Sequence, residues 1–152
     1  MSQKGEIAKK YFLEGYNCSQ SVLLAFCEEC GIDRETACKI SVPFGGGLAR
    51  QRLLCGAVSG MCMVAGLLYG NAAPGVGKSE HYALIQQLCN EFKEKNGTLF
   101  CGALLKSKGL TTTTSPVAEA RSPEYYKKRP CLQCIADAAD IVEAYRLKHL
   151  TE

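Results

Sequence analysis

The sequence predicts an all-α fold, a compact helical bundle of about five to seven helices around a buried, glycine-containing central helix. Apolar residues recur at helical spacing along most of the chain, and no stretch alternates apolar with polar residues as a half-buried strand does. The chain also lacks the strand and helix alternation of Rossmann and thioredoxin folds. With 152 residues, 47% of them hydrophobic, it is long enough for a real core. We expect one domain over residues 1–152.

Two helices are expected in the first thirty residues. An apolar face over residues 7–12 marks the first helix, which Gly15 interrupts. Asn17 is a good N-cap for the second helix, and Gln20 stands three positions later as its capping-box partner. Gly31 ends this second helix, because glycine readily adopts the left-handed conformation of a C-terminal cap.

A third, short helix and the central helix follow. Asp33 caps the third helix, which reaches about Ser41 and stops before Pro43. The central helix covers residues 54–70 and is apolar on nearly every face, so it needs packing partners all round. Glycines interrupt its apolar run and residues 70–75 break it, so we expect a buried helix rather than a membrane span.

The helical pattern continues in the second half of the chain. Ser79 is expected to cap a helix over residues 80–96, which Gly97 closes. A shorter helical turn follows Cys101, and the polar residues 111–114 form a loop.

Proline marks three further helix starts. Ser115-Pro116 and Ser122-Pro123 each place serine at a cap and proline at the first helical position. Pro130 introduces the last helix, about residues 131–148, whose apolar residues share one face.

Charge and the start of the chain exclude several classes of protein. Eighteen Lys and Arg against fifteen Asp and Glu give a net charge of +3, too small to indicate binding to nucleic acid or to a membrane surface. The basic run at residues 127–129 is expected to be a solvated face. Residues 1–7 lack the apolar stretch of a secretory signal, so we expect a cytoplasmic protein.

Cysteine content is the unusual feature of the composition. In a reducing cytosol, many cysteines indicate metal ligation or thiol redox chemistry before structural disulfides. Some of them are expected to be small buried hydrophobic residues and nothing more. The ten cysteines are Cys18, Cys27, Cys30, Cys38, Cys55, Cys62, Cys89, Cys101, Cys131 and Cys134.

Two cysteine pairs have C-x-x-C spacing. Cys27 and Cys30 lie at a helix end beside two carboxylates, where the pKa of a thiol is raised. Cys131 and Cys134 open a helix directly after the cationic residues 127–129, where positive charge and free amides favour a thiolate. Neither pair is followed by histidine, which excludes c-type haem attachment. The chain has two histidines, which argues against a Cys/His zinc finger.

Four cysteines begin a helix or follow a glycine-rich turn, namely Cys18, Cys55, Cys101 and Cys131. Helix-end dipoles and amide donors would stabilise four such thiolates, as a soft metal or an iron–sulfur cluster requires. Their spacings are too long for a zinc ribbon or a ferredoxin motif, and spacing alone does not establish that they converge.

Glycines stand close to these cysteines. Gly45, Gly46 and Gly47 form either a hinge or a nest of amide donors for cluster sulfides or an anion. Gly56 and Gly60, four residues apart, indicate close packing of the central helix. We take Gly45, Gly46, Gly47 and Gly56 as the candidate cofactor-binding residues.

Five motifs together resemble the C_GCAxxG_C_C family of redox-active proteins, in the family's order and over most of the chain. They are residues 15–20 (GYNCSQ), 44–47 (FGGG), 55–60 (CGAVSG), 101–102 (CG) and Cys131. The resemblance implies an all-helical domain related to the C-terminal region of split-Soret cytochromes. It also implies an iron–sulfur cluster, of unspecified type, held by Cys18, Cys55, Cys101 and Cys131.

The middle motif departs from the family label, because glycine follows Cys55 where the label places a glycine before the cysteine. This leaves Cys62 open as a substitute for Cys55, and Cys134 open as a substitute in the last motif. The haem attachment signals of split-Soret proteins are absent from the sequence.

The leading hypothesis is an electron-transfer protein with an iron–sulfur cluster and a redox partner that the sequence does not identify. One alternative is a metal-free thiol–disulfide protein in which Cys131 pairs with Cys134 or with another motif cysteine. Another is a structural zinc site on four cysteines. We also expect a homodimer, because the central helix needs apolar partners on all sides and split-Soret proteins are dimeric.

Overall fold

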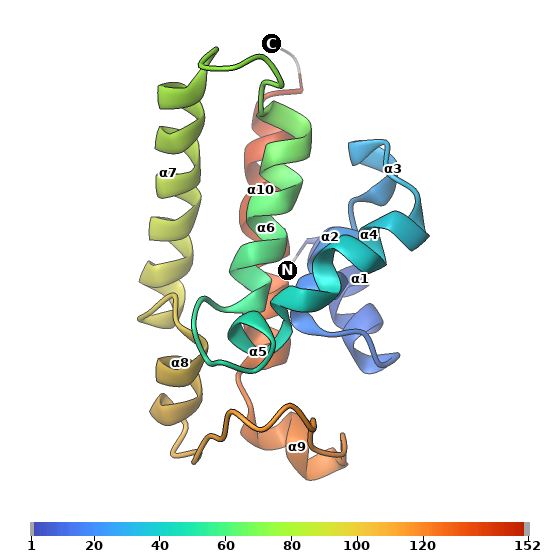
Figure 1. The fold of residues 1–152 in the computed structure, drawn as a ribbon, viewed down its shortest axis with the longest axis vertical. Coiled ribbons are helices and arrows are strands. Elements are labelled where there is room, and N and C mark those ends of the chain that lie inside the picture. Colours follow the sequence, from blue (N-terminus) through green and yellow to red (C-terminus); the bar gives the residue numbers. More distant parts are fainter. Residues whose placement is uncertain (1, 151–152) are drawn as a thin grey trace.

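The structure is a computed structural model that describes residues 2–150, and its central element is helix α6 (Gly56–Tyr69). Helix α6 packs against α2 (Cys18–Leu24), α7 (Lys78–Asn96) and α10 (Cys131–Lys148). Figure 1 shows α7, α6 and α10 running side by side, with the N-terminal helices grouped on the other side of α6.

The fold is all-α, as predicted. Residues 2–150 form no strand, and their one isolated β-bridge joins Leu54 to Phe100. Within the same residues seven helices have seven or more residues, which agrees with the expected five to seven. They are α1 (Gln3–Leu13), α2, α4 (Arg34–Ser41), α6, α7, α8 (Cys101–Ser107) and α10. The shorter helical turns are α3 (Cys27–Cys30), η1 (Val42–Phe44), α5 (Gly45–Leu48) and α9 (Pro123–Lys128).

Most of the predicted helix ends are confirmed by their hydrogen bonds. The Asn17 side chain accepts from the Gln20 amide, and the Gln20 side chain accepts from the Asn17 amide, which completes the capping box. Asp33 caps α4 and Ser122 caps α9, each by accepting a backbone N–H. Gly31 has the predicted left-handed cap conformation, with a φ of 65°, but it closes the separate helix α3, because the helix capped by Asn17 ends at Leu24.

Two predicted helix starts were wrong. Helix α7 begins at Lys78 after Gly77, so Ser79 lies inside the helix instead of capping it. Ser115 begins no helix, because the carbonyls of Ser115 and Val117 accept hydrogen bonds from Arg50 and are turned away from a helical ladder.

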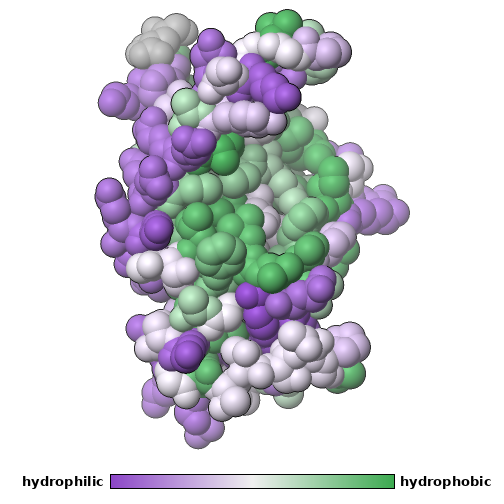
Figure 2. Space-filling model, turned by 60° about the vertical axis from the view of Figure 1, so that its left-hand side comes forward, coloured by the Kyte–Doolittle hydropathy of each residue, from purple (hydrophilic) through white to green (hydrophobic). Residues whose placement is uncertain are grey.

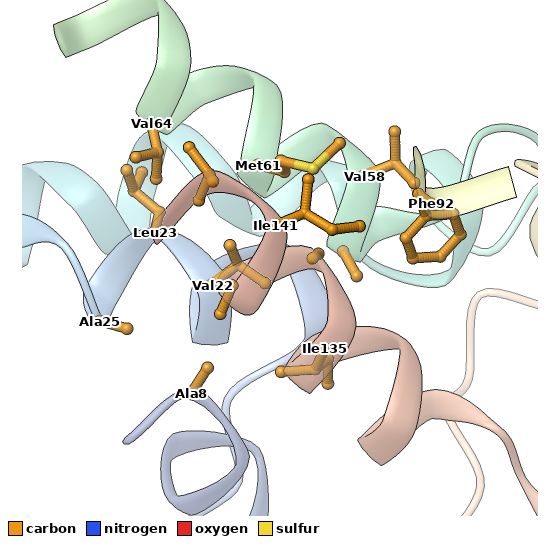
Figure 3. Close-up of a cluster of buried hydrophobic side chains, with 14 of the residues drawn as sticks. Ala8, Val22, Leu23, Ala25, Val58, Met61, Val64, Phe92, Ile135 and Ile141 are labelled. Carbon is orange, nitrogen blue, oxygen red and sulfur yellow. The ribbon is translucent and has the colours of Figure 1, made fainter. Parts of the chain in front are cut away.

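Helix α6 supplies the centre of the hydrophobic core. Its Val58, Met61 and Val64 side chains are fully buried and meet those of α2 and α10 (Figure 3). Residues 56–61 are all buried, as predicted for a central helix, whereas Leu67 is 48% exposed. The prediction of burial therefore holds for the first half of α6 and fails on one face of the second. No helix within residues 2–150 combines the length and the apolar character that a membrane span needs.

Glycine allows α6 to approach α2 closely. A β-carbon at Gly60 would lie 2.8 Å from the carbonyl oxygen of Ser19 and 2.9 Å from Cβ of Val22. The backbones of α2 and α6 are thus in contact at this point, which confirms the close packing predicted for this glycine.

Candidate functional site

Four cysteines from four separate helices lie together at one end of the bundle. Cys18, Cys101 and Cys131 are the first residues of α2, α8 and α10, and Cys55 is the N-cap of α6. The Cys131 thiol interacts electrostatically with the thiols of all three other cysteines, and Cys18 interacts with Cys55 and Cys101. The structure therefore brings the four motif cysteines into one group.

The group is not preformed as a site for a single metal ion, because within residues 2–150 no three His, Cys, Asp or Glu side chains stand close enough to hold one ion as they are. Tetrahedral zinc would require all four sulfurs at about 2.3 Å from the metal, and so within about 3.8 Å of one another.

Backbone amides point at two of the sulfurs. The Cys18 sulfur accepts from the amides of Gly46 and Ser19, and the Cys55 sulfur accepts from those of Ala57 and Val58. Such bonds favour the thiolate form and are the kind that tune sulfur ligands.

The loop that supplies the Gly46 amide has an unusual backbone. Gly46 and Gly47 have φ values of 65° and 71°, and four non-glycine residues follow in the same left-handed region. These four are Leu48, Ala49, Arg50 and Arg52. Left-handed residues other than glycine are uncommon and strained, and they cluster at functional sites. Hydrogen bonds such as that from the Leu53 amide to the Gly47 carbonyl, 2.9 Å long, hold the loop in place. This geometry favours the nest of amides over the hinge.

All four candidate glycines are in tight contact with their surroundings. A β-carbon at Gly56 would collide with the Cys18 sulfur, and one at Gly47 would lie 2.7 Å from Cβ of Cys101. A β-carbon at Gly45 would collide with the side chain of Asn17. Gly47 and Gly56 thus make room for the cysteines themselves, whereas Gly46 contributes its amide.

Arginine side chains surround the cysteine group, a feature that the sequence did not reveal. Nη1 of Arg52 lies 3.6 Å from the Cys101 sulfur and donates to it. The Arg52 side chain is 9% exposed, and its buried Nη2 has no hydrogen-bond partner and lies 4.0 Å from Glu119. Glu119 also pairs with Arg50 at 2.8 Å and with Arg129 at 3.0 Å. The one sequence feature that could have indicated these arginines is the position of Arg50 and Arg52 a few residues after Gly45–Gly47.

A pocket of about 380 Å³ opens in front of the cysteines. Three of the sulfur-bearing residues and four arginines line it, namely Cys18, Cys101, Cys131, Arg50, Arg52, Arg121 and Arg129. Cys55 is buried, with 7% of its surface exposed. The pocket therefore connects solvent to a cationic, thiol-rich wall.

The surroundings of the four thiols raise their pKa values. Burial raises the pKa of Cys18 to about 12, with the nearby Cys55 sulfur adding to the effect. Burial also raises the pKa of Cys131 to about 12, against the opposing effect of Arg129. The prediction that the helix start and cations favour a Cys131 thiolate was therefore wrong for the free thiol, because desolvation exceeds both. A bound metal cation would reverse this balance.

The remaining cysteines lie in other surroundings. Cys134 hydrogen-bonds to Cys55 and lies 3.7 Å from Oδ1 of Asn96, inside the core. Burial raises the pKa of Cys30 to about 11, with Cys27 and Glu29 contributing. The predicted direction is right for Cys30, but burial is the main cause. Cys62 does not join the group of four, because its partner is Cys89 on α7.

Fold and site define a cysteine-rich, all-α protein with four thiols gathered at the starts of its helices. The family model described as "Putative redox-active protein (C_GCAxxG_C_C)" matches residues 16–145, and the chain belongs to this family. The resemblance seen in the sequence is thereby confirmed. No curated protein and no solved structure matches the chain.

Proposed function

We propose that the protein transfers electrons through an iron–sulfur cluster bound by Cys18, Cys55, Cys101 and Cys131. The observation that carries this proposal is the grouping of four sulfurs from four helices, two of which accept backbone N–H groups and one of which accepts from Arg52. When bound, such a cluster supplies a one-electron redox centre.

The donor set fits a cluster. Thiolates are the protein ligands of iron–sulfur clusters, and four cysteines suffice for the common types. A cluster distributes its thiolates over several iron atoms, so it needs wider spacing than a single zinc ion.

The positive charges around the four cysteines also fit a bound cluster. Thiolate ligation brings negative charge into a buried site, which is unfavourable without compensation. Arg52 donates to Cys101, and Arg50 and Arg129 stand around the same pocket with one carboxylate, Glu119, among them. These arginines and the amides of Gly46 and Ala57 would stabilise the ligated state.

Anaerobic purification or reconstitution with iron and sulfide tests the proposal. We expect bound iron and sulfide and visible absorption between about 300 and 450 nm, as thiolate-ligated clusters give. Each of the four Cys→Ser variants at positions 18, 55, 101 and 131 should lose iron. Cys38→Ser is the matched control, because Cys38 is half-buried and lies outside the group. A colourless, iron-free protein after reconstitution refutes the proposal, and one zinc per chain would replace it with the structural alternative.

We further infer a cytoplasmic homodimer that exchanges electrons with a separate redox protein. An exposed apolar patch beside the site supports the dimer. The side chains of Leu53 and Phe100 are 49% and 55% exposed, and their segments are joined by a hydrogen bond of 2.7 Å from the Cys101 amide to the Leu53 carbonyl. Apolar side chains gathered in this way are typical of interaction surfaces.

A further inference from the structure

Three buried guanidinium groups converge on one carboxylate in the pocket in front of the cysteines. Nη2 of Arg50 lies 2.8 Å from one oxygen of Glu119, and Nη2 of Arg129 lies 3.0 Å from the other. Nη2 of Arg52 lies 4.0 Å from the first oxygen. These three arginine side chains are 9–13% exposed, whereas that of Glu119 is 43% exposed. Buried guanidinium groups need an anion close by, because an uncompensated buried charge is costly. The arrangement is that of an anion-binding site with a side chain of the protein inside it.

The carboxylate leaves part of this site unsatisfied. A carboxylate has two oxygens, and Arg50 and Arg129 each pair with one of them. Nη2 of Arg52 is buried and has no hydrogen-bond partner within residues 2–150, and a buried donor without a partner is unfavourable. Four arginines line the pocket, and Glu119 is the one acidic residue among its described lining residues. An anion with more than two oxygens would satisfy this site more fully.

The Glu119 carboxylate can leave the arginines without a change in the fold. It is carried by residues 110–122, a segment between α8 and α9 that forms no helix or strand. Arg50 holds this segment through its backbone, by donating to the carbonyls of Ser115 and Val117. Rotation of the Glu119 side chain toward solvent, which it already meets, keeps both of these bonds. An external anion therefore competes with one side chain and not with a packed element.

The pocket has room for a small molecule. Its volume of about 380 Å³ lies in the range of small-molecule sites, and Cys18, Cys101 and Cys131 line it beside the arginines. Residues 110–122 lie at the lower end of the molecule in Figure 1, and the surface of that end is mostly pale or hydrophilic in Figure 2. The middle of the same face is apolar. The charge of the pocket and the polar surface at this end both favour an anionic ligand.

We propose that the pocket binds a tetrahedral oxyanion of the phosphate or sulfate type, and that the Glu119 carboxylate takes its place when none is bound. Such an anion has an oxygen for each of Arg50, Arg52 and Arg129, and guanidinium groups bind phosphate through paired N–H donors. The arginines and Glu119 form this site without a cluster, so the inference does not depend on the iron–sulfur proposal.

Calorimetric titration of the full-length, metal-free protein with sodium phosphate tests the proposal. We expect saturable binding of one phosphate per chain at constant ionic strength, and competition by sulfate for the same site. Acetate, which has two oxygens, should bind at least about tenfold more weakly, because it cannot satisfy the third guanidinium group. The absence of saturable binding of both phosphate and sulfate, or equally tight binding of acetate, overturns the proposal.

Two matched pairs of variants assign the binding to its residues. Glu119→Gln should tighten phosphate binding about tenfold, because it removes the competing negative charge and keeps the size of the side chain. Arg129→Gln should weaken binding about tenfold or more, and Arg129→Lys should restore part of it, since lysine keeps the charge without the paired N–H groups. The controls are Glu124→Gln and Lys128→Gln, which remove the same charges from an exposed ion pair and should leave the affinity nearly unchanged.

These variants separate a specific site from a diffuse cationic surface. Equal losses of affinity in Arg129→Gln and Lys128→Gln would mean that phosphate responds only to the general positive charge, which overturns the proposal. Equal affinities of Glu119→Gln and the wild-type protein would refute the role given to Glu119. Cys55→Ser should lose iron and keep phosphate binding, because Cys55 is buried, so this proposal and the iron–sulfur proposal fail separately.

Discussion

Gly56 faces the sulfur of Cys18 so closely that no β-carbon fits between them. A β-carbon at Gly56 would also lie 2.7 Å from the carbonyl oxygen of Phe44. Helix α6 therefore begins with a residue whose lack of a side chain fixes where the first motif cysteine can lie.

Gly56→Ala should displace the Cys18 thiol, destabilise the protein by about 1–3 kcal/mol and reduce iron uptake. Gly66→Ala on the same helix is the control, because its β-carbon would meet open space. We expect Gly66→Ala to leave iron uptake unchanged and to stabilise the helix by about 0.5–1 kcal/mol. Urea denaturation and iron analysis measure both effects. Equal behaviour of the two variants would contradict a special role for Gly56.

Removal of the Arg52 guanidinium should change the electronic properties of the site. Arg52→Gln weakens the N–H···S contact with Cys101 and removes a positive charge, so the reduction potential of the loaded protein should fall. A shift of about 20–60 mV, equal to about 0.5–1.4 kcal/mol, is expected and would be measured by spectroelectrochemistry.

Lys39→Gln is the control for Arg52, since Lys39 is exposed and the change in net charge is the same. Arg52 also lowers the pKa of Cys101 against the effect of burial, so alkylation of Cys101 in metal-free Arg52→Gln should be slower at pH 8. An unchanged potential together with an unchanged alkylation rate would show that Arg52 only supports the loop.

Metal-free protein should lose stability in alkaline solution. The pKa values of Cys18 and Cys131 are raised from 9.0 to about 12, so above pH 9 the unfolded chain releases protons that the folded chain retains. Their contribution is complete below pH 9 and is lost as the pH rises toward 12, by at most about 1.4 kcal/mol per group for each pH unit.

Urea denaturation between pH 8 and pH 10.5 measures this loss. The double variant Cys18→Ala/Cys131→Ala should show a shallower decline, while the titration of lysines and tyrosines affects both proteins alike. Parallel curves for the two proteins would mean that these thiols ionise as readily when folded as when unfolded.

The apolar patch beside the site should control assembly. Light scattering of the wild-type protein should give twice the 16.5 kDa of one chain. Leu53→Glu should halve this mass, whereas Leu13→Glu, at a leucine 54% exposed on α1, should not. A mass near 16.5 kDa for the wild-type protein at all concentrations would mean that the chain is a monomer.

The helices were predictable because their signals are local. Asn17 and Gln20 stand three residues apart and form the capping box that their identities predict. The positions of Cys18 and Cys131 at helix starts follow in the same way from Asn17 and Pro130. The helix start predicted at Ser115 was wrong because a hydrogen bond from Arg50, 65 residues away in the chain, determines the conformation of this segment.

Features that depend on packing were not predictable. The contact between Arg52 and Cys101 and the ion pair of Arg50 with Glu119 join residues far apart in sequence, with no pattern that links them. The raised pKa of Cys131 depends on how deeply its helix start is buried, and charges counted along the sequence do not reveal this.

The four grouped cysteines are spread over the chain, from Cys18 on α2 to Cys131 on α10. During synthesis the first three of these cysteines emerge from the ribosome before Cys131 does, so the site is incomplete until Cys131 follows. Any cofactor that needs all four could be inserted only after α10 has been made and has docked. Assembly of the proposed cluster and completion of the fold would therefore be one event.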